Sequence, residues 1–482
     1  MISTRKALWL LLATAVLIVL VTGCNDTLRQ FITPVPAPGG DPGALSHAIV
    51  LSTNPATPTA SNPALGSDLH IDVSGDSVVG VVPVGPLPKF LGKTTNKVFV
   101  LNGDGTVTSY LALLPQSTPI STVTLPPGTV AQGGGFSNSG NFYVVNSGTA
   151  PPSPSSSNNV GVISASVSAI TATIPVGTNP VAVAGNNANN KIYVVNQGSG
   201  NATGNVTVVS TIDNFVIGNI QVGTSPVWGV MAPDGVHVFI VNQGSNDVSV
   251  IDTLLDQVIA TIPVGTSPNY AVFEPTNQRL YVSNTGSPTI SVIKANGIDL
   301  AQGILPTKIA EIPIPAAADS IAALADGSRA YAAMGGCPAG TNHTTIIANL
   351  PSCTGNQVAV IDTQALALRK VLTVGLGAVS IDAANNSSRV YVISANDITT
   401  ITSNVPSPQP SRTFATPSVS IINTASDTVL RQTVDPSITS LVPTFHVPQQ
   451  DPACVPTIDS SFNTKVPLPC PEQAPFVVRI VP

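Results

Sequence analysis

Short runs of β-branched and aromatic residues, separated by polar or glycine-containing turns, recur along most of the chain. Three copies align most clearly, because residues 174–180, 220–226 and 262–268 all read Ile-x-Val-Gly-Thr-(Asn/Ser)-Pro. Each copy is followed by an apolar segment that contains an aromatic residue and ends in Asn, and then by another apolar run. No stretch sustains a helical period with caps, so we expect an all-β chain with few helices.

The repeat returns about every 42 to 60 residues, depending on loop length. Weaker copies of the aromatic segment bring the count to eight units; they lie at residues 49–54, 98–102, 142–146, 330–334 and 390–394. Each unit has the pattern of four short strands, which is typical of a propeller blade. Because one such sheet cannot bury both of its faces, we expect the blades to stack around an axis.

These motifs resemble the YVTN family of β-propeller repeats, which occur in exported and surface proteins of bacteria and archaea. The resemblance covers residues 46–445 and is most specific in the fourth to sixth units. The usual ring of that family has seven blades, so seven is the alternative to our count of eight. The first unit lacks a first strand, and residues 434–443 have the pattern of a connector plus a first strand. We therefore predict that a C-terminal strand completes the N-terminal blade and closes the ring.

Residues 1–23 have the organisation of an export signal, with Arg5 and Lys6 before an apolar run over residues 7–21. The following Val-Thr-Gly-Cys sequence resembles the lipobox of bacterial lipoproteins, which implies cleavage before Cys24 and acylation of its thiol and amino group. The alternative is an ordinary secretory signal or an uncleaved helix, although the run is short for a membrane span. Residues 24–45 are predicted to be a flexible spacer. Asn25 after the lipidated cysteine favours the outer membrane or cell surface over the inner membrane.

Four further cysteines form two pairs, each sixteen positions apart: Cys337 with Cys353, and Cys454 with Cys470. In an oxidising compartment two local disulfides are the natural pairing. A zinc site is the alternative, but the close CxxC spacing is missing. The second pair lies in residues 446–482, which we predict to be a Pro-rich C-terminal tail.

The composition adds an unusually low charge to this picture. Charged residues make up 9% of the chain, hydrophobic residues 43%, and the net charge is −6. A disordered chain has the opposite balance. The 18 Lys and Arg residues form no basic run, so we expect no nucleic-acid partner.

The long insertions fall mainly between the second and third strands of a unit, at residues 55–67, 147–159, 197–204, 335–356 and 395–417. In a four-stranded meander these loops share one face, so this face is the predicted binding surface, unless the loops are only tolerated decoration. Only the segments 294–308 and 111–119 extend the opposite face. Trp228 and Tyr270 occupy matched positions in consecutive units and could form an aromatic platform near the channel mouth, or pack between blades.

No catalytic motif, metal-ligand spacing or cofactor fingerprint stands out, and the five histidines are scattered. Asp252 and Asp362 are interpreted as acceptors for turn N–H groups, and the repeated Asn146, Asn196, Asn242 and Asn284 as turn formers. We therefore expect a non-enzymatic, membrane-anchored binding or scaffold propeller with protein or glycan partners, and no metal or cofactor. The alternatives are a propeller enzyme with a site at the channel mouth, and a structural envelope protein without a discrete ligand.

Overall fold

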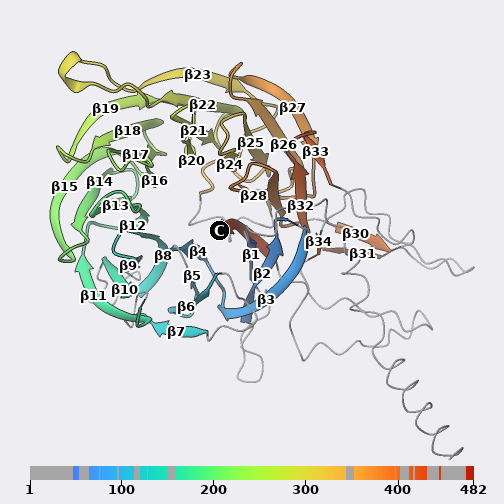
Figure 1. Cartoon of the computed structure of the whole chain (residues 1–482), viewed down its shortest axis with the longest axis horizontal. Helices are drawn as coiled ribbons and strands as arrows, with labels where there is room; N and C mark the ends of the chain where they lie inside the picture. The colour runs from blue at the N-terminus through green and yellow to red at the C-terminus, as the bar shows by residue number, and fades with distance from the viewer. Residues whose placement is uncertain are drawn as a thin grey trace, which may run out of the picture.

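The protein is an eight-bladed β-propeller, in which four-stranded antiparallel sheets stand side by side around a central axis (Figure 1). The fold is taken from a computed structural model, which describes residues 47–53, 65–74, 76–94, 97–112, 120–126, 129–148, 158–164, 166–342, 352–396, 398–401, 412–415, 418–430, 445–446 and 474–481. The all-β class and the count of eight blades are confirmed, and the seven-blade alternative is wrong. The predicted signal, spacer and Cys24 lie outside the described residues.

We number the blades along the chain and letter their strands A to D from the axis outward. Blades 1 to 4 consist of β35 (Ala474–Val481), β1 (His47–Thr53), β2 (Leu65–Asp72), β3 (Ser77–Pro86); β4 (Phe90–Lys93), β5 (Lys97–Leu101), β6 (Thr106–Leu111), β7 (Ser121–Thr124); β8 (Thr129–Phe136), β9 (Phe142–Gly148), β10 (Asn159–Ser164), β11 (Ala169–Pro175); and β12 (Pro180–Ala184), β13 (Lys191–Asn196), β14 (Thr203–Ser210), β15 (Phe215–Thr224).

Blades 5 to 8 consist of β16 (Pro226–Met231), β17 (His237–Asn242), β18 (Asp247–Asp252), β19 (Gln257–Pro263); β20 (Pro268–Glu274), β21 (Arg279–Asn284), β22 (Thr289–Lys294), β23 (Thr307–Pro313); β24 (Ser320–Ala323), β25 (Arg329–Met334), β26 (Gln357–Asp362), β27 (Ala367–Thr373); and β28 (Ala378–Ala383), β29 (Arg389–Ser394), β32 (Ser418–Asn423), β33 (Thr428–Val429). A hairpin of β30 (Ile398–Ile401) and β31 (Arg412–Ala415) interrupts blade 8, and β34 (Phe445–His446) pairs with β32. The short 3-10 helix η1 (Leu300–Gln302) lies between β22 and β23.

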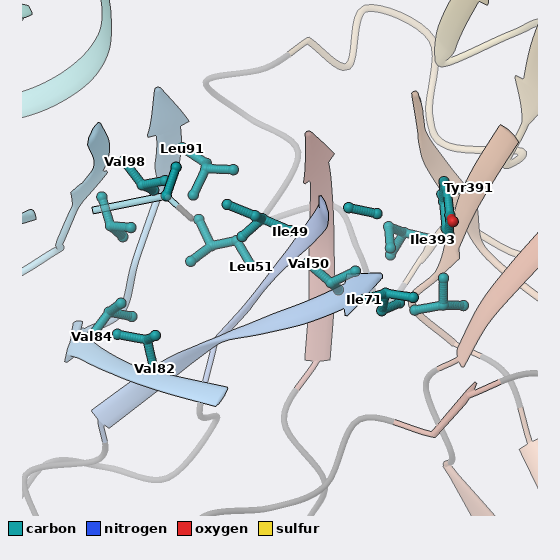
Figure 2. Close-up of a cluster of buried hydrophobic side chains, with 14 of the residues drawn as sticks. Ile49, Val50, Leu51, Ile71, Val82, Val84, Leu91, Val98, Tyr391 and Ile393 are labelled. Atoms are coloured by element: carbon teal, nitrogen blue, oxygen red, sulfur yellow. The ribbon is translucent and has the colours of Figure 1, made fainter. Parts of the chain in front are cut away.

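The core lies between adjacent blades. Strands B and C are buried along most of their length because a neighbouring blade covers each face, whereas strand D alternates exposed and covered positions. Figure 2 shows this arrangement at blade 1, where Ile49 and Leu51 point towards Val98 of blade 2, while Val50 points towards Ile393 of blade 8. Each blade thus buries both faces only because the ring is closed.

The ring closes through the last strand of the chain. β35 pairs antiparallel with β1, with His47 opposite Val481, and supplies strand A of blade 1. The prediction that a C-terminal strand completes the first blade is therefore confirmed. The segment named for this role was wrong, because β35 and not residues 434–443 occupies the position, and residues 474–481 of the predicted tail belong to the propeller.

A set of ionic contacts reinforces the stacking of the blades. At the closure, Asp76 of blade 1 accepts hydrogen bonds from Arg389 Nε at 2.9 Å and Tyr391 Oη at 3.3 Å, both on blade 8. Asp256 of blade 5 contacts Lys191 and Tyr193 of blade 4 in the same way, each at 2.7 Å. In blades 4 and 8 the tyrosine of the repeat thus donates its hydroxyl hydrogen bond to an aspartate of the next blade.

The repeated asparagines act differently from our expectation. Asn196 and Asn242 are fully buried at the end of strand B, and neither has a left-handed backbone. Their side chains donate across the blade to Thr207 and Ser249 of strand C, at 2.9 Å in both cases. The interpretation of these asparagines as turn formers was wrong. Their side-chain amides instead donate hydrogen bonds to buried hydroxyl groups of strand C at the end of strand B.

Candidate functional site on the long-loop face

Strand direction alternates within a blade, so the B–C loops and D–A connectors lie on one face, which we call the long-loop face. The A–B and C–D turns lie on the opposite face, which we call the turn face. The described parts of the predicted insertions occupy the long-loop face, including residues 197–202, 335–342 and 352–356. The candidate site lies on this face over blades 5 to 8.

The B–C loop of blade 7 is held to three neighbouring blades. Cys337 and Cys353 form a disulfide with a Cα–Cα distance of 4.1 Å. The loop reaches blade 6, where Gly340 N donates to Thr285 Oγ1 at 3.1 Å, and blade 5, where Asn342 Nδ2 donates to Gln243 Oε1 at 3.3 Å. On the other side Asn396 Nδ2 of blade 8 donates to the Cys353 carbonyl at 2.6 Å. The described parts of this loop, residues 335–342 and 352–356, are therefore fixed to the neighbouring blades.

Asp319, in the connector that enters blade 7, holds the start of this loop. Its buried carboxylate accepts the N–H of Cys337 at 3.5 Å, and the backbone of Gly335 and Gly336 also hydrogen-bonds to it. Burial raises the pKa of Asp319 to about 7, because desolvation outweighs the three backbone hydrogen bonds. The charge that fixes the loop start therefore titrates near neutral pH.

Trp228 and Tyr270 lie at equivalent levels of strand A in blades 5 and 6, paired with Val241 and Ser283 of their strands B. Their ring centroids are 4.8 Å apart and their planes are tilted by 37°. Both rings pack against the cores between blades, yet both keep part of their surface exposed. The structure thus brings the two sequence candidates together as one half-buried aromatic pair.

A polar chain links the aromatic pair to the loop. Ser283 Oγ donates to Asn269 Oδ1 at 2.9 Å, and Asn269 Nδ2 donates to the Asp319 carbonyl at 2.7 Å. We did not single out Asn269 or Asp319 from the sequence. An alignment of the repeats could have singled out Asn269, because the equivalent strand A position is valine in blades 4, 5 and 8. Aromatic faces beside amides and hydroxyls suit sugar rings and peptide side chains.

A second polar cluster lies between blades 1 and 2 and is closed to solvent. Tyr110 Oη donates to Asp68 Oδ2 at 2.6 Å and lies 3.1 Å from His70 Nε2, and the His47 and His70 ring centroids are 5.8 Å apart. Desolvation raises the pKa of Asp68 to about 7 and lowers that of His70 to about 3, helped by His47. The sequence showed these histidines as scattered, because only the ring packing brings them together. Their complete burial makes the cluster part of the core and not an accessible site.

Within the described part of the chain, no three His, Cys, Asp or Glu side chains gather where they could hold a metal ion. In the same residues, no helix has the length and apolar character needed to cross a membrane. The predicted pair Cys454–Cys470 lies outside the described residues, as does His343 in the loop of blade 7.

Comparison with known proteins supports the fold alone. No protein-family model matches the chain, and neither does any curated protein. Among solved structures, the chain is similar to the dihydro-heme d1 dehydrogenase NirN in complex with DHE, at 14% identity and a TM-score of 0.57, over 86% of this chain and 78% of that one. It also matches the Kuenenia stuttgartiensis hydrazine synthase at 16% identity and a TM-score of 0.46, over 73% of this chain and 97% of that one.

Proposed function

We propose that this protein is a lipid-anchored, extracytoplasmic propeller that binds protein or glycan partners through its long-loop face, without catalysis. The observation that carries the proposal is the fixation of residues 335–342 and 352–356 in the blade 7 loop, through a disulfide and contacts to blades 5, 6 and 8. A tolerated surface insertion needs no such fixation, whereas a binding surface gains affinity when it is ordered before the ligand arrives. The resemblance to YVTN repeats of exported proteins is consistent with this role.

The anchor belongs to the same proposal. A lipobox-like sequence ending at Cys24 would place acyl chains at the N-terminus, and several acyl chains hold a protein firmly on a membrane. We propose the outer membrane or the cell surface as its location. Replacing Cys24 by Ala should move the protein from the membrane fraction to the soluble fraction. Unchanged membrane retention would contradict lipidation at this residue.

The binding role can be tested with the chain that follows the signal, residues 25–482. This chain contains a single tryptophan, Trp228, because the other one is Trp9. Glycan arrays and immobilised cell-envelope proteins serve as probes for wild type and for a Cys337→Ala/Cys353→Ala variant, with Gln364→Ser on the turn face as the control. We expect a ligand whose binding weakens in the loop variant, persists in the control and changes the fluorescence of Trp228.

Three results would overturn the proposal. Binding that is equal in the loop variant and in wild type would remove the long-loop face from the function. Chemical turnover of the captured ligand would favour the alternative of an enzyme at the channel mouth. Absence of any ligand across both probe sets would favour the structural envelope protein.

A further inference from the structure

Exposed aliphatic side chains gather on the turn face of consecutive blades. They lie at or beside the C–D turns of blades 3 to 6, and we call them the aliphatic rim: Val167, Ile212, Leu254, Leu255, Ile304 and Leu305. The exposed fractions reach 65% at Val167, 70% at Ile212 and 84% at Leu254. Scattered exposed aliphatics need no explanation, but exposed aliphatics at the same turn of four consecutive blades indicate a contact surface.

The repeat itself shows that the turn does not require these residues. In blade 5, Asp252 Oδ1 accepts the N–H groups of Leu254 at 2.8 Å and Leu255 at 2.9 Å. In blade 7, Asp362 Oδ1 accepts the N–H groups of Gln364 and Ala365, both at 2.9 Å. The same turn geometry therefore carries two exposed leucines in one blade and a polar and a small residue in another. The corresponding turn of blade 8 contains Ala425 and Ser426, so the described turns of blades 7 and 8 lack the exposed leucine pair of blade 5.

Blade 6 replaces the short turn by an ordered extension that also ends in aliphatic residues. Asp299 caps η1 by accepting the N–H groups of Ala301 and Gln302, and its backbone pairs with Ile304. Ile304 and Leu305 are 46% and 42% exposed. In Figure 1 this extension leaves the ring beside β23. An ordered loop that displays aliphatic side chains to water matches a surface with an apolar partner.

The chain path joins the rim to the proposed anchor. Strand B of each blade starts on the turn face, and β1 begins there at His47, opposite Val481. The residues between Cys24 and His47 reach at most about 75 Å when fully extended, and about 26 Å on average for a flexible chain. Because the chain enters β1 on the turn face, this face is the nearer of the two to an acylated Cys24.

We propose that the aliphatic rim inserts into the interfacial layer of the membrane that carries the lipid anchor, so that the long-loop face points away from the bilayer. This inference rests on the lipid anchor of the proposed function. The rim suits a lipid surface because aliphatic side chains gain free energy on leaving water at the headgroup boundary. Among the acidic side chains of these turns, Asp256 is paired with Lys191 Nζ at 2.7 Å and Asp252 accepts two turn N–H groups, while Asp213 is exposed beside Ile212.

The test uses the lipidated protein in vesicles that contain a phospholipid with a photoreactive group on its acyl chain. After flotation and illumination, labelled peptides are mapped by mass spectrometry. We expect labels on the turns of the rim and on the extension of blade 6, and few on the long-loop face. The variant Ile212→Gln/Leu254→Gln/Leu255→Ala copies the residue types of blade 7. This variant should lower lipid labelling of the rim turns roughly tenfold, because the free energy of burying even one leucine side chain corresponds to about a tenfold change in an equilibrium constant. The control Ala425→Ser should label as wild type does.

Three other outcomes would contradict insertion of the rim into the membrane. Labels spread evenly over both faces, or concentrated on the long-loop face, would overturn the orientation while leaving the anchor intact. The rim could instead remain unlabelled while light scattering shows that wild type is a dimer and the rim variant a monomer. That result would make the rim an interface between two copies of the chain. Failure of wild type to float with vesicles would overturn the anchor and this inference together, whereas binding through the long-loop face would still be testable in residues 25–482.

Discussion

Replacing Asp68 or His70 should expose two opposite pH dependences that cancel in the wild-type protein. Both side chains are fully buried in strand C of blade 1, at positions that pair with Leu51 and Ile49. By the same register, the position of Asp68 is valine or isoleucine in all seven other blades. The position of His70 is aliphatic in six of them. Blade 1 thus carries a titratable pair in a site built for aliphatic packing.

The two pKa shifts act on stability with opposite signs. Asp68 has a folded pKa of about 7 against 3.8 in the unfolded chain, so its contribution to stability is present below 3.8 and is lost as pH rises towards 7. His70 has a folded pKa of about 3 against 6.5, so its contribution is present above 6.5 and is lost as pH falls towards 3. Between pH 3.8 and 6.5 the folded and unfolded states bind the same number of protons on this pair, and its slopes cancel.

Single replacements remove the cancellation. A difference of one bound proton changes the free energy of unfolding by about 1.4 kcal/mol per pH unit. Between pH 4.5 and 6.5 each group alone therefore changes the free energy of unfolding by roughly 2 kcal/mol. Relative to wild type, Asp68→Asn should gain about this amount of stability as pH rises over the interval, and His70→Val should lose about the same. Urea unfolding at the two pH values, followed by the fluorescence of Trp228 and by circular dichroism, measures both changes.

The comparison with wild type at each pH cancels every other titrating group. Tyr110→Phe is the control within the cluster, because it removes the hydroxyl that contacts both residues and leaves both titratable groups in place. Parallel pH profiles for Asp68→Asn, His70→Val and wild type would refute the reasoning, since they would mean that neither group holds a shifted pKa in the folded ring.

Three further predictions concern the ring and its loop. Asp76→Asn should lower the free energy of unfolding by about 2 kcal/mol, as expected for loss of a partly buried charged contact. Asp256→Asn should have a similar effect, because it removes the equivalent contact between blades 4 and 5. An unchanged urea midpoint for Asp76→Asn would contradict the closure contact. Reduction of Cys337–Cys353 should leave the circular dichroism spectrum unchanged but speed hydrogen exchange of the loop, which mass spectrometry detects; loss of the β signal would show that the bridge holds more than the loop. Truncation before β35 should expose the edge of β1 and cause aggregation or a large fall in melting temperature, and a truncated protein as stable as wild type would contradict closure by this strand.

Much of this fold could be predicted because the sequence repeat is most regular in blades 4 to 6. There the aromatic and asparagine positions recur with little loop insertion, which sets both strand count and register. The closing strand was assigned to the wrong segment because β35 follows a Pro-rich stretch, and no repeat motif precedes it to mark its place. Pairing with a strand more than four hundred residues away leaves no local signal.

The candidate site was predictable only in part. The matched positions of Trp228 and Tyr270 followed from the repeat, and their ring contact follows from blade stacking. The roles of Asn269 and Asp319 depend on hydrogen bonds to residues distant in the sequence, in the next blade or in the blade 7 loop, which no local pattern encodes. The same is true of Asp68 and His70, whose unusual character appears only when the strands of different blades are aligned by register.

The most direct test of the account compares the two faces of the anchored protein in intact cell envelopes. A photo-cross-linking amino acid replaces Ala339, which is exposed in the blade 7 loop, or Ala425, which is exposed on the turn face outside the rim. Illumination should give a discrete protein or glycan adduct at position 339 and none at position 425. An adduct at position 425 with none at 339 would contradict the assignment of the long-loop face as the binding surface.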